Sequence, residues 1–200
     1  MLLATIFNIN DGVAMFPLML LFCKLFVVVT VVIGFVVDVP DPGVMQRPPR
    51  KPGTRIVTNP QIVRWLISGF LVAFSALSLL MWGPDEPSTE FPSISMTMAF
   101  AVVALSAVNM GLVMRREREP VWATPVFPYL GWILLGWTLT LLAVEFQFLQ
   151  RILLTESLTG AQWALCIGLS AISPGVIWID KTIQIRKLDR SSHPALATTA

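Results

Sequence analysis

Long apolar blocks alternate with short polar stretches along the whole chain. Five of these blocks reach the roughly 20 apolar residues that a helix needs to cross a bilayer, and a break in the pattern follows each block. We predict membrane-spanning helices at about 15–37, 61–83, 95–114, 126–149 and 161–179. The predicted fold is therefore an all-α, polytopic membrane helix bundle of about five transmembrane helices.

The first seven residues are also apolar, but they are too few to cross a bilayer. Asn8, Asn10, Asp11 and Gly12 follow them and form a turn-like stretch. Neither a basic segment nor a small-residue cleavage site marks a signal peptide here. We interpret residues 1–14 as a helix stub with an outer loop, residues 15–190 as one transmembrane domain, and residues 191–200 as a disordered tail.

The composition supports a membrane protein, since 55% of the 200 residues are hydrophobic and 13% are charged. Soluble domains carry about 25% charged residues. The formal charge of +2 gives no reason to expect a nucleic-acid partner. The apolar composition makes the lipid bilayer the expected environment. Cys23 and Cys166 lie inside apolar blocks without a CxxC pair, and the sequence predicts no disulfide framework or zinc site.

Basic residues are concentrated in the stretch between the first two spans, in the stretch between the third and fourth spans, and after the fifth span. The positive-inside rule makes these stretches cytoplasmic. The loop between the second and third spans is acidic and is predicted to face outward. We therefore expect an integral protein of the plasma membrane with its N-terminus outside, its C-terminus in the cytoplasm, and Tyr129 as an interfacial aromatic anchor.

Lys24, Ser106 and Asn109 are the polar side chains that the pattern places at membrane depth. A charged residue there costs roughly 2.5–3.5 kcal/mol on insertion scales. Two interpretations of Lys24 stay open. Its ammonium either pairs with oxygen atoms on neighbouring helices, such as Asn109, or with a carboxylate of another chain, or it snorkels or loses its proton. For Asn109 and Ser106, helix–helix hydrogen bonds are favoured over an ion path.

Small residues recur at helical spacing in three spans, which predicts that helix backbones approach closely there. The pairs are Gly69 with Ala73, Ala107 with Gly111, and Ala164 with Gly168. Glu145 lies near the outward end of the fourth span, so a solvated carboxylate is favoured over a proton relay.

The first cytoplasmic stretch reads Asp41-Pro-Gly-Val-Met45-Gln-Arg47-Pro48-Pro49-Arg50 and resembles the proline-rich loop after the sixth membrane helix of calcium-type P-type ATPases. Thr97–Phe100 and the stretch from Leu149 to Trp163 are similar to the eighth helix and to the loop between helices nine and ten of that family. The resemblance implies that the chain runs from a stub of family helix five through helices six to ten. The prolines stiffen a short non-helical path, and Arg47, Arg50 and Lys51 can meet lipid headgroups or a neighbouring cytoplasmic domain. A charged anchor at the interface is favoured at least as much as a coupling role.

In the resembled family, ATP phosphorylates the aspartate of an Asp-Lys-Thr-Gly-Thr motif. Here Asp180-Lys181-Thr182 is followed by Ile183-Gln184, and no glycine-rich phosphate loop occurs. We expect no catalytic or cofactor-binding residues in this chain, and ATP and Mg²⁺ would belong to the missing domains. The family's sixth helix carries Asn-Leu-x-x-Asp as cation ligands. Lys24 and Val28 stand at those two positions, so no metal ligand is expected either.

The predicted function is that of the truncated C-terminal transmembrane part of a P-type cation-transporting ATPase, which is not a pump on its own. Its expected partners are the bilayer and the remaining ATPase polypeptide, or another membrane protein. A non-catalytic membrane scaffold or regulatory subunit is the alternative. An independent channel or carrier would need a polar path, and the predicted spans offer little beyond Lys24 and Asn109.

Overall fold

The computed structural model describes residues 2–39, 59–86, 91–115 and 127–192. Its elements are helices, and the described residues include no strand. The first long helix is continuous from Pro17 to Val37 and comprises α2 (Pro17–Phe22), the π-helical segment η2 (Cys23–Val28) and α3 (Val29–Val37). The other elements are α1 (Leu2–Ile6), η1 (Ile9–Gly12), α4 (Asn59–Trp82), α5 (Ile94–Met114), α6 (Phe127–Glu145), α7 (Gln147–Leu153) and α8 (Gly160–Ser192).

Four helices are long and apolar enough to cross a membrane, namely Pro17–Val37, α4, α5 and the Gly160–Gln184 part of α8. A fifth span is formed if Tyr129–Glu145 is counted together with α7, to which it is bent by 80°. The predicted helical membrane bundle is therefore confirmed. The predicted end of the fourth span at residue 149 is wrong, because the helix breaks at Phe146, whose backbone is extended.

The last helix is longer than predicted and continues past residue 179 to Ser192. It therefore includes Ser191 and Ser192, which the sequence assigned to a disordered tail, while residues 193–200 lie outside the described part. Pro174 lies inside this helix.

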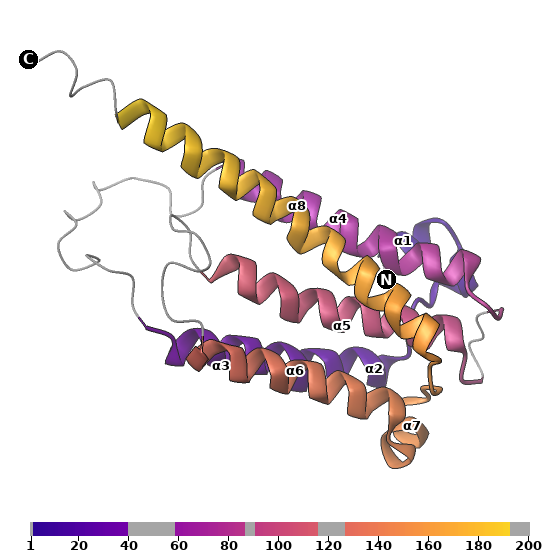
Figure 1. The fold of residues 1–200 in the computed structure, drawn as a ribbon. Helices are drawn as coiled ribbons and strands as arrows, with labels where there is room; N and C mark the ends of the chain where they lie inside the picture. Colours follow the sequence, from indigo (N-terminus) through magenta and orange to yellow (C-terminus); the bar gives the residue numbers. More distant parts are fainter. Residues whose placement is uncertain (1, 40–58, 87–90, 116–126, 193–200) are drawn as a thin grey trace, which may run out of the picture.

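The long helices form three layers with α5 in the middle (Figure 1). On one side α5 packs against α4 and α8, which also pack against each other. On its other side α5 packs against η2 and α6, and α3 packs along α6. In α5, 72% of the apolar stretch is buried, against 28% in each of the other three spans that qualify alone. The central helix is thus enclosed by protein, and the outer helices present apolar side chains to lipid.

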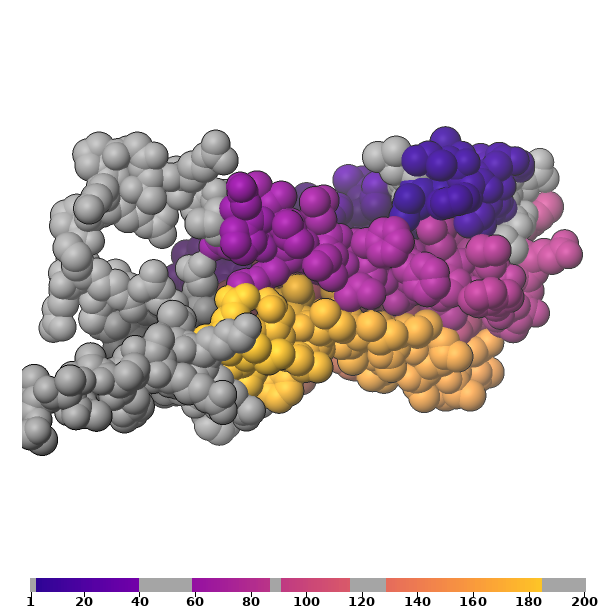
Figure 2. Space-filling model, turned by 90° about the horizontal axis from the view of Figure 1, so that it is seen from above, coloured from indigo at the N-terminus to yellow at the C-terminus, as the bar shows by residue number. Residues whose placement is uncertain are grey.

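The face of the bundle seen in Figure 2 shows α4 and α8 side by side, with the N-terminal segment of α1 and η1 beside the C-terminal part of α4. Large apolar side chains of α4 are exposed on the outside, including Leu66 (68%), Phe70 (61%) and Phe74 (59%). In a soluble protein such a surface would be unusual. In a bilayer it is the expected lipid-facing surface.

The helices approach most closely at glycines on α3, α5 and α6. A Cβ atom added to Gly111 would lie 2.4 Å from Val31 Cγ1 and 2.7 Å from the hydroxyl of Tyr129. A Cβ on Gly34 would lie 2.7 Å from the Tyr129 ring. The predicted close approach is confirmed at Gly111. It is wrong within the described residues for Gly69 and Gly168, where no atom lies within 4 Å of the added Cβ; Gly69 lies in the open groove between α4 and the first span.

The N-terminal stretch forms the short helix α1 and then turns back, as the sequence predicted. Asn8, Asn10 and Asp11 have left-handed φ values of 48°, 49° and 52°, and Gly12 follows at 81°. Asn and Asp tolerate this conformation better than other side chains, and Gly adopts it without cost. Pro17 then occupies the first turn of α2, where its missing N–H is not needed.

Candidate functional site

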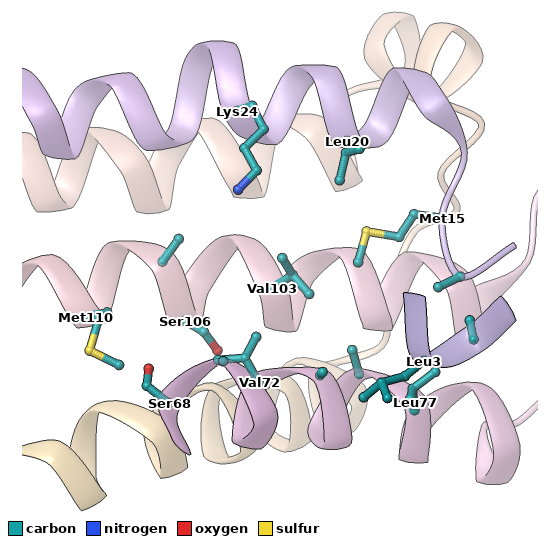
Figure 3. Close-up of a pocket in the computed structure, with 16 residues that line it drawn as sticks. Leu3, Met15, Leu20, Lys24, Ser68, Val72, Leu77, Val103, Ser106 and Met110 are labelled. Atoms are coloured by element: carbon teal, nitrogen blue, oxygen red, sulfur yellow. The ribbon is translucent and has the colours of Figure 1, made fainter. Parts of the chain in front are cut away.

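A groove lies between α2–η2 and α4, with α5 as its floor. Its volume is about 460 Å³. The residues of the α4 wall lie on one face of that helix. The floor residues are three and four positions apart along α5, so they also share one helix face. Leu20 and Lys24 form the opposite wall, and α1 with Met15 borders the end near Leu77 (Figure 3). The α4 wall comprises Ser68, Gly69, Val72, Ala73, Ala76 and Leu77, and the floor comprises Val103, Ser106, Ala107 and Met110.

Lys24 is the charged residue in the lining of this groove. Figure 3 shows its side chain extending from the first span toward α5. The side chain is exposed, and it makes no ion pair or hydrogen bond within the described residues. Lys24 lies in the π-helical segment Cys23–Val28. Such widened turns often occur at functional sites, and this one contains both Lys24 and Val28, the positions that the resemblance matched to cation ligands.

Asn109 connects three helices of the bundle. Its side-chain amide donates a hydrogen bond to Ser170 Oγ on α8 at 3.4 Å, and its carbonyl oxygen accepts one from Trp137 Nε1 on α6 at 3.2 Å. The favoured interpretation of Asn109 as a helix–helix contact therefore agrees with its position. The suggested pair with Lys24 is not formed, because both ends of the Asn109 side chain are bound elsewhere.

Ser106 is buried on α5 and donates a hydrogen bond to the backbone oxygen of Ser170 at 3.4 Å. Ser68 lies across the groove on α4, and its hydroxyl is 3.0 Å from that of Ser173 on α8. Both hydroxyls lining the groove are thus already engaged with α8. They contribute polarity to the groove without forming a cluster of free oxygen ligands.

A buried ion pair joins the ends of the first and third spans, and the sequence did not predict it. Asp38 directly follows α3, and Arg115 directly follows α5. The guanidinium donates two hydrogen bonds to the carboxylate, at 2.6 and 2.7 Å, and the Arg115 side chain is fully buried. The hydrogen bonds to Asp38 raise the pKa of Arg115 above its ordinary value.

Tyr129 completes this cluster from the start of α6. Its ring is fully buried, stacks on Phe35 with ring centres 5.5 Å apart, and lies 5.7 Å from the Arg115 guanidinium. The prediction of an interfacial anchor is wrong for Tyr129. Its side chain packs against the glycine contacts of α3 and α5 and not against lipid headgroups.

The opposite end of the bundle carries carboxylates that cap backbone groups. Asp85 accepts hydrogen bonds from the backbone N–H groups of Ile94 and Ser95, both at 2.7 Å, and one from the Ser95 hydroxyl. Burial of the Asp85 carboxyl acts to raise its pKa, but these hydrogen bonds outweigh burial and hold the pKa below its ordinary value. Glu145 is exposed, as predicted, and accepts a hydrogen bond from Trp163 Nε1 at 2.9 Å.

The described residues contain no group of three or more histidine, cysteine, aspartate or glutamate side chains that could hold a metal ion. Asp180, the aspartate of the partial phosphorylation motif, pairs with Arg64 of α4 at 2.8 Å, near the C-terminal end of the Gly160–Gln184 span. The predicted loop residues Asp41, Met45, Arg47, Pro48, Pro49 and Arg50 lie outside the described part, and their role stays a prediction.

Residues 12–183 match the family model described as "Cation transporting ATPase, C-terminus". This match includes nearly all of the described membrane-spanning helices, so the chain belongs to the cation-transporting ATPase family and represents its C-terminal membrane region. A search of curated proteins found no match to this chain. The match does not distinguish calcium-type members, so that part of the resemblance stays a prediction.

Proposed function

We propose that this chain supplies the C-terminal helices of the membrane domain of a cation pump. In this proposal it acts together with ATP-hydrolysing domains that lie outside these 200 residues, in the same or a separate polypeptide. The observation that carries the proposal is the family match over residues 12–183, which includes nearly all of the described membrane-spanning helices.

The packing of the bundle favours a structural role for this chain, and not direct binding of the transported cation. The polar side chains of α5 are bound to α6 and α8 through Asn109 and Ser106. Lys24 and Val28 stand where the resembled family has an amide and a carboxylate, and neither can act as a hard-cation ligand. We expect the oxygen ligands for the transported cation to come from other helices of the pump.

We propose further that the chain lies in the plasma membrane with its N-terminus outside. The distribution of charges in the bundle supports this orientation. Arg64 and Lys181 border one pocket at the end of α5 that also carries Arg115, whereas Asp85 and Glu145 lie toward the other end. Basic residues favour the cytoplasmic side. Glycosylation acceptors placed between residues 83 and 93 should then be modified, and acceptors placed after residue 184 should not.

The test of the proposed function is purification of the tagged chain from its native membrane in mild detergent. Mass spectrometry should find a sequence with the phosphorylated-aspartate motif in the purified material, either on the same polypeptide or on a partner. Incubation with labelled ATP should give an acid-stable, hydroxylamine-sensitive phosphoenzyme, as expected for an aspartyl phosphate. Recovery of a membrane protein without ATPase sequence, and no phosphoenzyme, would contradict the proposal and favour the scaffold alternative.

A further inference from the structure

We propose that the groove between α2–η2 and α4 receives another transmembrane helix of the pump, and that a carboxylate on this helix pairs with Lys24. The inference rests on the proposed function, because it assigns the occupant to the remaining membrane part of the same transporter. It names the chemistry of that part, namely an apolar helix with one aspartate or glutamate at the depth of Lys24.

The depth of Lys24 makes an unpaired charge unfavourable. It lies seven residues after Pro17 and thirteen before Val37 in a continuous span. At 1.5 Å per residue, this is about 10 Å from one end of the span and about 20 Å from the other. Figure 3 shows the side chain extending toward α5 and not along the span toward its N-terminal end. The ammonium is therefore directed into the groove and needs a counter-charge there.

The described spans do not contain this counter-charge. Their carboxylates lie at or near the ends of the spans and have other partners. Asp38 is bound to Arg115, Asp180 to Arg64, and Glu145, the last residue of α6, to Trp163. A second copy of the described bundle would therefore bring a second lysine to the groove and no carboxylate at its depth. Charge complementarity thus points to a different helix.

The shape of the groove fits a helix. Along α4 the lining extends from Ser68 to Leu77, which is about 14 Å or two and a half helical turns. Most of its wall and floor residues are small, so that a helix backbone can approach closely. No described atom lies within 4 Å of the position of a Cβ on Gly69, so the space above this wall is open. The helix α1 and Met15 border the groove only at the end near Leu77.

The experiment places a photo-crosslinking amino acid at Val72, which lines the groove, in the full chain in its native membrane. The matched control places it at Phe70, two residues away on the same helix, which is 61% exposed and does not line the groove. Crosslinked peptides are identified by mass spectrometry. We expect Val72 to crosslink to a membrane helix of the ATPase that carries an aspartate or glutamate, and Phe70 not to do so.

The role of the charge is tested by measuring the same crosslink in Lys24→Met and Lys24→Arg. We expect Lys24→Met to lower the crosslinking yield about fivefold or more, and Lys24→Arg to retain it, because a guanidinium can also pair with the carboxylate. Leu25→Met is the matched control, since Leu25 is exposed and lies outside the groove lining.

Several outcomes would overturn the inference. They are crosslinks from Val72 to lipid alone, to a second copy of this chain, or to a helix without a carboxylate, and an unchanged yield in Lys24→Met. If the phosphoenzyme is nevertheless found in the purified material, the proposed function stands and only the groove inference fails. If neither a phosphoenzyme nor an ATPase sequence is found, the proposed function itself is wrong.

Discussion

Arg115 and Lys24 are two cationic residues of the helical bundle with opposite surroundings. The Arg115 side chain is fully buried, makes two hydrogen bonds to Asp38, and lies beside the ring of Tyr129. Lys24 is exposed in a groove, and no described residue neutralises it. The charge of Arg115 is paired within the chain. In our proposal the charge of Lys24 is paired only when another helix occupies the groove. The difference separates residues that hold this bundle together from a residue that prepares it for assembly.

The largest effect is expected from breaking the Arg115 pair. Asp38→Asn removes the carboxylate charge that the buried guanidinium binds, and breaking a buried pair from one side costs about 3–5 kcal/mol. The measurement is the free energy of unfolding in mixed micelles with increasing SDS.

The control is the double variant Asp38→Leu with Arg115→Leu, which removes both charges. Replacement of a buried pair by apolar residues is often neutral or stabilising, so most of the lost stability should return. A double variant as unstable as Asp38→Asn would show that the ion pair is not the cause.

A smaller loss is expected from Gly111→Ala, which disturbs the packing around the same cluster. The added methyl group would meet Val31 and the Tyr129 hydroxyl, and both side chains belong to the buried core. Overpacking of this kind costs about 1–3 kcal/mol. Gly168→Ala is the matched control, since it adds the same group to an open position and should be neutral or slightly stabilising. Equal effects of the two substitutions in SDS unfolding would contradict the close contact at Gly111.

Asp85→Ala extends the comparison to a carboxylate whose described hydrogen bonds come from backbone N–H groups and a hydroxyl. The variant removes acceptors from the first N–H groups of α5 and should cost about 1 kcal/mol near neutral pH. Because the folded protein holds the pKa of Asp85 below its ordinary value of 3.8, this contribution is fully present above that value. It is lost as the pH falls through the folded pKa. Thermal unfolding in detergent from pH 7 to pH 3 should show the two proteins converging at the acid end.

Asn109→Ala tests a neutral polar contact at membrane depth. It removes the hydrogen bonds to Ser170 and Trp137. Interhelical hydrogen bonds in membranes average about 0.6 kcal/mol, so we expect a loss of this order in SDS unfolding. A loss comparable to that of Asp38→Asn would mean that Asn109 does more than link helices.

The smallest effect is expected from Lys24→Met on the purified chain alone. The Lys24 side chain makes no described contact that the substitution would break, and the change should lie within about 0.5 kcal/mol of the parent. The same variant is expected to weaken assembly in the native membrane, as described above. A strong destabilisation of the chain alone would place Lys24 in the same class as Arg115 and end the distinction between them.

The sequence predicted the spans well because lipid-facing helices need long apolar stretches, which a simple window detects. The bend after Glu145 was missed because Phe146, Phe148 and Leu149 continue the apolar pattern through the break. A hydropathy window detects apolar composition and does not detect a change in the direction of the helix axis.

The candidate site was predicted only in part. Lys24, Ser106 and Asn109 were visible as polar residues inside apolar blocks. The pair of Asp38 with Arg115 joins residues that are 77 positions apart. The charge count assigned Arg115 only to the cytoplasmic basic stretch after the third span, since no local pattern connects it to Asp38. A useful signal would have been that each charge directly follows the last apolar residue of a span. The burial of Tyr129 followed from the same tertiary contacts, and propensity alone predicts an interfacial position.

The middle layer formed by α5 also bears on how the bundle is made. The first span and α4 are synthesised before α5, yet a groove lies between them and their main shared neighbour is α5. During insertion they would remain separate helices in the lipid until the third span arrives. The order of synthesis therefore makes α5 the step at which independent helices become one domain, and a defect in α5 should expose the earlier helices to membrane quality control.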